Sequence, residues 1–507
     1  MPYVRTVKTS SGATAVQIVY SYHRGSRQIE HIGSAHDDAE LALLKAVARQ
    51  KLAAGQGVLD LGPGFGAGSG GPLPILSSRM GVLLDALACG YDVLGLRLAA
   101  GRDRVFADLV AARIIEPASK LDSLRVLEEA GVAPVSYATL KRRLPVYAKE
   151  SFRQKISAAC AAHAGLGPAS LVLFDVSTLY FEADAGDGFR EPGFSKERRL
   201  EPQITIGLLT DQRGFPLMVS AFEGNKAETK TMLPVIEAFM AAHSLPDVTV
   251  VADAGMVSEA NQKQIEAAGL SFILGMRIPQ VPYVVKRWRR EHPGEQIPDG
   301  HIFTQPWPAG PNGGRRDQTI YYQYRHDRAR RTLRGIDEQV AKAEKAVAGN
   351  APVKRNRFIQ LSGGTRSVNR ELEDKARSLA GLKGYVTNLR ACPDGTLVTA
   401  EFVIGAYHQL FQIEKSFRMA KSDLQARPIY HHLRDSIEAH LTIVFAALAV
   451  SRWIEQQTGW SIRKFVKTAR RYRTIEIQAG DHTLTAADPI PDDVGAAIDA
   501  ISRARTH

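Results

Sequence analysis

The chain has little cysteine, no apolar run of membrane-spanning length and no apolar signal region at its N-terminus. Its three cysteines, Cys89, Cys160 and Cys392, lie far apart among 507 residues, which argues against both a disulfide framework and a cysteine-based zinc site. The longest apolar run, residues 441–450, is shorter than the ~20 residues that cross a bilayer, so it predicts a buried helix. These absences predict a protein of the reducing cytoplasm with no membrane partner.

Positive charge is in excess, and it is unevenly distributed. The formal net charge is +12 and the isoelectric point is about 9.5, which favours a polyanionic partner. Residues 281–357 hold 16 Lys and Arg against 8 Asp and Glu, and they also carry Trp288, Tyr321, Tyr322 and Tyr324. Basic residues interleaved with aromatic ones are typical of a nucleic-acid surface. A solubilising patch on an irregular domain has the same composition.

The first 74 residues predict a small β-hairpin with a helix and then a linker. Alternating apolar residues predict the hairpin and the helix within residues 1–54. Residues 55–74 are rich in glycine and superficially resemble the cofactor loop of S-adenosylmethionine-dependent methyltransferases. A helix precedes this stretch, however, and Gly-Ser-Gly-Gly-Pro follows it, whereas the cofactor loop requires a strand before it and a helix after it. A linker is the favoured interpretation.

Residues 75–165 have the pattern of helices throughout. Two short helical segments, 119–131 and 136–144, flank a Gly-Val-Ala-Pro turn. The second segment begins at a capping serine and carries Lys141, Arg142 and Arg143. The pair predicts a helix-turn-helix with a basic second helix that binds DNA, and an ordinary helical hairpin with a basic exposed face is the alternative.

From residue 166 the pattern changes to strands. The expected order over residues 166–278 is three strands, a helix, a strand, a helix and a strand, which predicts a mixed sheet with helices on its faces. The stretch 279–381 interrupts this order and predicts a basic, β-rich insertion with its own small β structure. The α/β pattern resumes in residues 382–460, and residues 461–507 form a peripheral extension. The expected segments are strands 171–181, 203–209, 215–222, 248–252, 272–274 and 384–389 and helices 228–243, 258–268 and 434–457.

Three carboxylates stand where this pattern places functional residues. Asp175 and Asp253 each lie at or next to an apolar strand, where an unpaired carboxylate is costly. Glu414 lies on an expected amphipathic helix over 407–421, on one face with Arg418 and Lys421. Taken singly, they are read as turn residues or as a solvated ion-pair stripe. Taken together, the three carboxylates form a donor set for two divalent cations.

This order of elements resembles the ribonuclease-H-like fold, and the carboxylates resemble those of Asp-Asp-Glu insertion-sequence transposases with a β-rich insertion before the Glu. That family's signature is Tyr, two residues, Arg, three residues, Glu, six residues, Lys. Tyr407, Glu414 and Lys421 stand at these spacings, whereas Leu410 replaces the Arg and Arg418 is the candidate to compensate. Other family blocks are resembled by residues 175–181, 193–199, 222–226, 251–256 and 387–388.

The resemblance implies a transposase that binds terminal inverted repeats, cuts at the element ends and joins the 3′ ends to target DNA. Asp175, Asp253 and Glu414 would then be catalytic and would hold two Mg²⁺ ions, for which Mn²⁺ substitutes. The implied partners are double-stranded DNA, as element ends and target, and a second copy of the chain on DNA. The alternatives are a ribonuclease-H-like nuclease without strand transfer and an inactive DNA-binding derivative. The implied DNA contacts are Tyr407, Arg418, Lys421, Lys196, Arg199, Lys141, Arg142 and Arg143.

The implied location is the bacterial cytoplasm, in association with the nucleoid.

Overall fold

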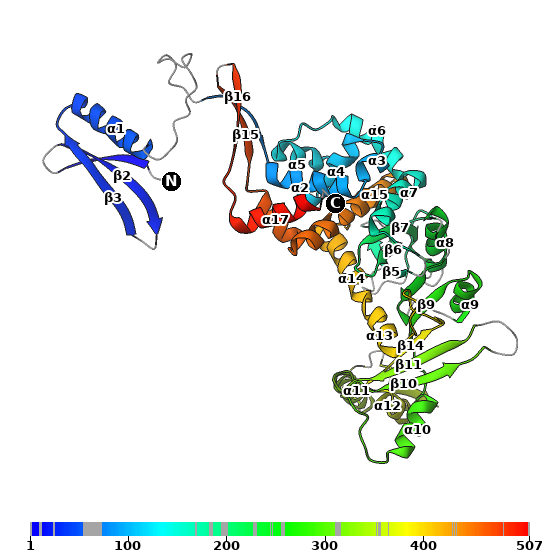
Figure 1. Cartoon of the computed structure of the whole chain (residues 1–507). Helices are drawn as coiled ribbons and strands as arrows, with labels where there is room; N and C mark the ends of the chain where they lie inside the picture. Colours follow the sequence, from blue (N-terminus) through cyan, green and yellow to red (C-terminus); the bar gives the residue numbers. More distant parts are fainter. Residues whose placement is uncertain are drawn as a thin grey trace. The chain divides into compact units, whose positions relative to one another are not determined.

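The computed structural model (Figure 1) divides into two compact units, which are Met1–Pro74 with Gln478–Leu484, and Ile75–Ile477 with Thr485–His507. Most of the expected linker, residues 55–72, lies outside the described residues. The structure describes residues 3–9, 13–23, 26–53, 73–167, 170–181, 186–193, 201–226, 231–243, 245, 247–254, 259–309, 316–350, 352, 356–362, 365–427, 429, 431, 433–479 and 481–504.

The first unit contains a three-stranded antiparallel sheet and one helix. Its elements are β1 (Tyr3–Lys8), β2 (Thr14–His23), β3 (Ser26–Ala35) and α1 (Asp38–Ala53). Alternate residues of β2, Val16 and Ile18, are buried with Ala48 of α1 in a small separate core. Asp38 and Glu40 occupy the first turn of α1, where the helix dipole favours acidic residues.

The second unit contains a helical region organised around one long buried helix. α15 (Arg434–Thr458) packs against α2, α4, α6 and α17. By length and composition α15 passes the test for a membrane span, but 94% of its apolar window is buried inside the protein, which confirms the buried helix predicted for residues 441–450. The other elements of this region are α2 (Gly81–Val93), α3 (Leu96–Ala99), α4 (Arg104–Ile115), α5 (Asp122–Ala130), α6 (Tyr137–Ala148), α7 (Glu150–Ala164), α16 (Ile462–Ala469) and α17 (Asp492–Arg503).

The C-terminal residues were expected to be peripheral, and the structure differs. Ile501 of α17 is only 2% exposed and belongs to the main core. β15 (Thr474–Ala479) pairs with β4 (Ile75–Arg79), with Thr474 opposite Arg79. β16 (His482–Ala487) is the third strand of that sheet. Apolar residues at helical spacing in α17 explain its burial, because a helix with one apolar face needs a partner surface.

An eight-stranded mixed sheet forms the rest of the second unit, in the order β10-β11-β14-β9-β8-β5-β6-β7. β5, β8 and β9 run parallel to one another, and all other neighbouring strands are antiparallel. The predicted mixed sheet is therefore confirmed. In chain order, the strands and helices of this part begin with β5 (Leu171–Tyr180), β6 (Gln203–Asp211), β7 (Pro216–Glu223), α8 (Met232–His243), β8 (Thr249–Ala252), α9 (Glu259–Ala267) and β9 (Ser271–Met276).

The stretch 279–381 was expected to have its own β structure, and this needs correction. β10 and β11 join the large sheet through β14 (Leu382–Thr387), with Tyr321 opposite Tyr385. A sheet edge must be paired or covered, and the apolar, aromatic β11 covers that of β14. Within the described residues of this stretch, only the strand pair β12-β13 forms a separate sheet. The elements are α10 (Tyr283–Glu291), β10 (Ile302–Trp307), β11 (Gln318–Tyr324), α11 (His326–Val347), β12 (Ile359–Ser362), β13 (Thr365–Val368) and α12 (Arg370–Ser378).

Candidate active site

Asp175 and Asp253 occupy equivalent positions on neighbouring parallel strands. The β5–β8 ladder pairs Leu173 with Val251, and each aspartate follows two residues later. Adjacent strands lie about 4.8 Å apart, so the register brings the two aspartates side by side where β8 ends. Asp253 is exposed and Asp175 is half-buried. Ligand sites form where parallel strands end, and this edge of the sheet meets that condition.

The helix expected over 407–421 is three segments in the structure. α13 (Ala400–His408) carries Tyr407, α14 (Leu410–Arg418) carries Glu414, and a π-helix, Met419–Asp423, carries Lys421. The turn tightens at Gln409, whose carbonyl accepts from the Gln412 N–H at 2.8 Å. It widens after Arg418, where the Leu424 N–H bonds to the Met419 carbonyl at 2.9 Å. The regular helical spacing that placed Lys421 on the face of Glu414 therefore ends at Arg418.

Side chains hold α14 against the sheet at the turn between β6 and β7. The Ser416 hydroxyl donates to the Gly214 carbonyl at 2.6 Å. Arg452, 3% exposed, donates to the Arg213 carbonyl and to the Gln412 side chain. A Cβ atom on Gly214, whose φ is +77°, would lie 2.7 Å from the Gln412 carbonyl oxygen. The close approach of α14 to this turn therefore requires glycine.

Tyr407 connects α13 to Asp253, the aspartate that follows β8. Its hydroxyl donates a hydrogen bond to Asp253 Oδ1. Burial of the ring and the charge of Asp253 raise the pKa of Tyr407. The ring packs over Gly275 of β9, where an added Cβ would lie 2.7 Å from the Tyr407 hydroxyl, and it meets Tyr385 edge-on at a centroid distance of 5.0 Å. Tyr407 is 5% exposed, so the predicted contact with DNA would require its hydroxyl to leave Asp253.

Lys383 of β14 is a site residue that the sequence reasoning missed. Its Nζ lies 4.3 Å from the centroid of the Tyr407 ring. Burial lowers the pKa of Lys383, and the charges of Asp253 and Glu414 partly offset this effect, so both carboxylates lie within its electrostatic reach. The signal was present in the sequence, because a lysine is unusual in a strand that is otherwise apolar.

The donor chemistry of the three carboxylates fits a divalent cation, since Mg²⁺ prefers oxygen ligands. Glu414 is exposed on α14, and α14 packs against β5. Within the residues that the structure describes, no three His, Cys, Asp or Glu side chains are grouped closely enough to hold a metal ion. The structure thus brings Asp175 and Asp253 together, and it places Glu414 nearby without completing a three-carboxylate cluster.

Of the other residues predicted to contact DNA around Glu414, the structure describes Arg418 and Lys421. Arg418 is exposed on α14, one turn after Glu414. Lys421 is half-buried, and its Nζ lies 5.9 Å from the centroid of the Phe417 ring. Lys196 and Arg199 lie outside the described residues.

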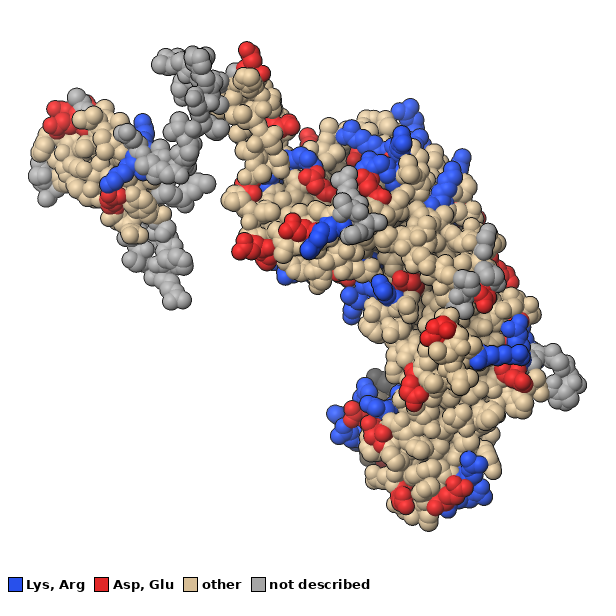
Figure 2. All heavy atoms as spheres, in the orientation of Figure 1, with Lys and Arg blue, Asp and Glu red and all other residues tan. Residues whose placement is uncertain are grey.

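The predicted helix-turn-helix corresponds to α5 and α6. Gly131 ends α5 with a φ of +87°, and Ser136 caps α6 by accepting from the Thr139 N–H. Both elements were predicted from these residues. Figure 2 shows Lys and Arg side chains gathered over the region of α4 to α6, and again over α11 and α12.

The three basic residues of α6 have different environments. Arg143 forms an ion pair with Asp103, and the Asp103 side chain also caps α4 and accepts from the Tyr147 hydroxyl at 2.9 Å. Arg143 therefore joins two helices of the region. Lys141 and Arg142 are exposed, and they are the members of this set that are available to a ligand.

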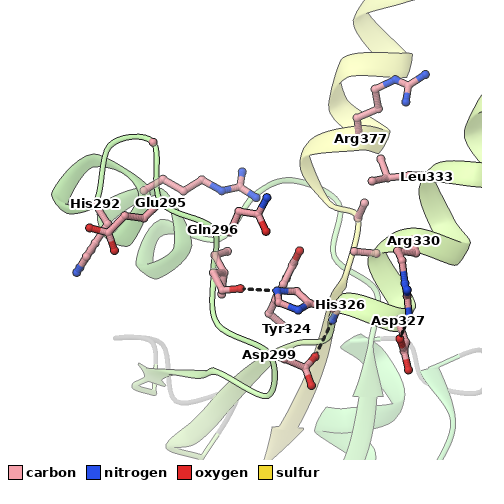
Figure 3. Close-up of a pocket in the computed structure, with 15 residues that line it drawn as sticks. His292, Glu295, Gln296, Asp299, Tyr324, His326, Asp327, Arg330, Leu333 and Arg377 are labelled. Atoms are coloured by element: carbon pink, nitrogen blue, oxygen red, sulfur yellow. Dashed lines mark hydrogen bonds and ion pairs between the residues drawn. The ribbon is translucent and has the colours of Figure 1, made fainter.

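A cavity of about 830 Å³ lies in the stretch 279–381 (Figure 3), away from the elements that carry the carboxylates. Several charged groups in its wall have partners. Arg330 pairs with Asp327, and Asp299 accepts from the His326 N–H at 2.7 Å. Arg377, also in its wall, pairs with Glu373. None of the three expected catalytic carboxylates lines this cavity, so the candidate active site remains the edge of the sheet at Asp175 and Asp253.

Comparison with known proteins identifies the family. The family model described as "Transposase DDE domain" matches residues 167–450, which is more than half of the chain, and no curated protein matches the sequence. A cryo-EM structure of a piggyBac transposase synaptic complex with hairpin DNA is similar at 11% identity and a TM-score of 0.36, covering 77% of this chain and 70% of that one. The family match confirms the resemblance found in the sequence. The chain belongs to the transposase DDE domain family, and it is an enzyme that acts on DNA.

Proposed function

We propose that this enzyme is the transposase of an insertion sequence, which binds terminal inverted repeats, cleaves at the element ends and transfers the 3′ ends to target DNA. The observation that carries the proposal is the shared level of Asp175 and Asp253 on adjacent parallel strands, with the Glu414 helix packed against β5. Three carboxylates from these elements are the donor set that the family name implies.

The topology of the sheet supports a ribonuclease-H-like core. β5, β6 and β7 are consecutive antiparallel strands that lie next to one another in the sheet. β8 and then β9 lie on the other side of β5, and these two strands are parallel to each other. β14 and the strands of the stretch 279–381 extend this core beyond β9. The residues inserted before Glu414 therefore enlarge the sheet next to the candidate site.

Each functional residue has a proposed role. Asp175, Asp253 and Glu414 would hold Mg²⁺ or Mn²⁺. Such ions, when bound, lower the pKa of a water or of a DNA 3′-hydroxyl and stabilise the departing oxygen. Tyr407 donates a hydrogen bond to Asp253 and would therefore compete with a metal ion for that carboxylate. Arg418 provides a guanidinium group one turn from Glu414, where it would form bidentate hydrogen bonds to a DNA phosphate.

DNA binding would use a second region of the protein. Lys141 and Arg142 on the exposed face of α6 would contact the phosphates of the inverted repeat. The basic stretch 281–357 would add affinity that depends on salt, because phosphate neutralisation releases counterions. Two element ends must be joined in one reaction, so we propose a homodimer on DNA, acting in the bacterial cytoplasm at the nucleoid.

A strand-transfer assay tests this function. The substrate is a duplex of the DNA that flanks this reading frame, cut at the element ends, incubated with a target plasmid and Mg²⁺ or Mn²⁺. We expect joined products in which the 3′ ends are linked to target DNA. Nicking without a joined product would instead identify a nuclease. Binding of the ends without any nicking would identify an inactive derivative.

A further inference from the structure

Lys383 is placed unusually for a lysine. It lies in β14 between two neighbouring strands, β11 and β9, and it is half-buried. Its Nζ lies over the ring of Tyr407 at 4.3 Å and farther from the ring of Tyr385, at 5.8 Å. Because Tyr407 bonds to Asp253, the ammonium group is directed to the same side of the sheet as the candidate catalytic carboxylates.

The positive charge of the Lys383 ammonium group is only partly balanced by neighbouring groups. Among the residues that the structure describes, it forms no ion pair within 4 Å and donates no hydrogen bond, although it senses the charges of Asp253 and Glu414. A cation that is half withdrawn from water is costly unless it is paired, and cation–π contact offsets only part of that cost. Its three N–H donors are therefore available to an anion at this site.

We propose that Lys383 is a further catalytic residue, whose ammonium group donates to a non-bridging oxygen of the phosphodiester under attack. This proposal rests on the proposed function, because the anion it requires is the DNA backbone. Phosphoryl transfer develops charge on such oxygens, and donors that are already in place stabilise it without reorganisation. Lys383 combines positive charge, partial burial and a position over the Tyr407 ring, whose hydroxyl bonds to Asp253, which are the properties this role requires.

The reaction is balanced without any proton exchange at Lys383. The oxygen of water, or of a DNA 3′-hydroxyl, forms a bond to phosphorus while the bond from phosphorus to the departing 3′-oxygen breaks. The proton of the attacking group passes to solvent, and the departing oxygen takes up a proton from solvent. Lys383 keeps its charge throughout and contributes hydrogen bonds only.

A purely structural role for Lys383 can be distinguished from a phosphate contact, because the two roles predict different effects of its loss on metal binding. If the ammonium group only holds Asp253 and Glu414 in place, its loss weakens metal binding together with cleavage. If it contacts the phosphate, its loss removes a positive charge beside two carboxylates. Metal binding is then unchanged or tighter, while cleavage becomes slower.

The experiment compares Lys383→Met and Lys383→Arg with Lys375→Met, which removes a positive charge from an exposed position of α12. Cleavage of a duplex with the flanking DNA of this reading frame is timed in Mg²⁺, and Mn²⁺ binding to the DNA-free protein is measured by electron paramagnetic resonance. We expect Lys383→Met to slow cleavage on the order of 10²-fold without weaker Mn²⁺ binding. Lys383→Arg should recover much of the rate, and Lys375→Met should match the wild type.

Each other outcome overturns the proposal. Normal cleavage by Lys383→Met would show that no phosphate contact is lost. Slower cleavage with weaker Mn²⁺ binding would show a structural role. A wild-type protein that does not cleave its flanking DNA would overturn the proposed function and this proposal with it, whereas a wild type that cleaves beside an equally active Lys383→Met overturns the role of Lys383 alone.

Discussion

Asp175 and Asp253 each follow, two residues later, the last residue pair of a β-ladder, whereas Glu414 is held by a helix that side chains dock onto the sheet. The ladder between β5 and β8 sets the level of the two aspartates through backbone hydrogen bonds, which do not depend on individual side chains. The position of α14 depends on side chains, namely the buried Ile413, the Ser416 hydrogen bond and Arg452. One half of the candidate site is therefore set by backbone pairing, and the other half is set by side-chain contacts.

The ends of α14 reinforce this difference. The helix is preceded by the tightened turn at Gln409 and followed by a π-helix, Met419–Asp423, and π-helical turns occur frequently at functional sites. Irregular turns on both sides therefore separate α14, which carries Glu414, from the segments that carry Tyr407 and Lys421.

The largest expected effect comes from removing any one carboxylate. Asp175→Ala, Asp253→Ala and Glu414→Ala should each slow cleavage and joining on the order of 10³-fold or more, because each would remove a metal ligand. Binding of the element ends, measured by gel shift, should remain close to that of the wild type. Asp499→Ala, which removes an exposed carboxylate from α17, is the control.

The view that the strands and the helix supply two halves of one site fails if the aspartate and glutamate variants differ in whether they cleave DNA. Should Glu414→Ala retain normal cleavage while both aspartate variants lose it, then the helix does not supply a ligand. The site would then consist of the strand residues alone.

A second prediction concerns the contact between β9 and Tyr407. Gly275→Ala places a Cβ 2.7 Å from the Tyr407 hydroxyl and 3.0 Å from the Ala254 backbone nitrogen, so Tyr407 or the end of β8 must move. A displacement of about 1 Å at a catalytic site costs on the order of 10²-fold in rate, and overpacking costs ~1–3 kcal/mol of stability. Timed cleavage and urea unfolding measure the two effects.

Gly405→Ala is the matched control for that variant. A Cβ on Gly405, which lies in α13 on the same segment as Tyr407, meets no atom within 4 Å. Alanine favours a helix over glycine by ~1 kcal/mol, so this variant should be at least as stable as the wild type and equally active. An equal loss of activity in both variants would contradict the role assigned to the contact at Gly275.

The order of the elements was predictable from the sequence, because each strand and helix of the core carries its own periodicity. The addition of β10 and β11 to the large sheet was not predictable in the same way. Their partner β14 follows about 60 residues after β11 along the chain, and local patterns do not specify distant pairing. The break at Gln409 was also missed, since neither proline nor glycine marks it.

The candidate site was predictable to a similar extent. Residue type and context predicted Asp175, Asp253 and Glu414, and the register of β5 and β8 supports the first two. The roles of basic residues were harder to predict, because they depend on distant partners. Arg143 was expected to contact DNA, yet it pairs with Asp103, 40 positions earlier in the chain.

A third prediction tests the docking of α14. Ser416→Ala removes the hydrogen bond to the Gly214 carbonyl and leaves a buried acceptor without this donor, at a cost of ~1–3 kcal/mol. Urea unfolding should show this loss, and cleavage should slow about tenfold because Glu414 is held less firmly. Ser502→Ala, at an exposed position of α17, should change neither quantity. A stability loss without slower cleavage would show that the docking contact does not position Glu414.

The smallest expected effect comes from Tyr407→Phe, which removes the hydrogen bond from the Tyr407 hydroxyl to Asp253. Asp253 is exposed, so water replaces the lost donor, and a carboxylate released from Tyr407 is more available to a metal ion. One net hydrogen bond corresponds to about 1 kcal/mol, so Mn²⁺ binding should become about fivefold tighter in the DNA-free protein. Electron paramagnetic resonance measures this change. Weaker Mn²⁺ binding would mean that Tyr407 orients Asp253 for the metal instead of competing with it, and the strand half of the site would then depend on the helix after all.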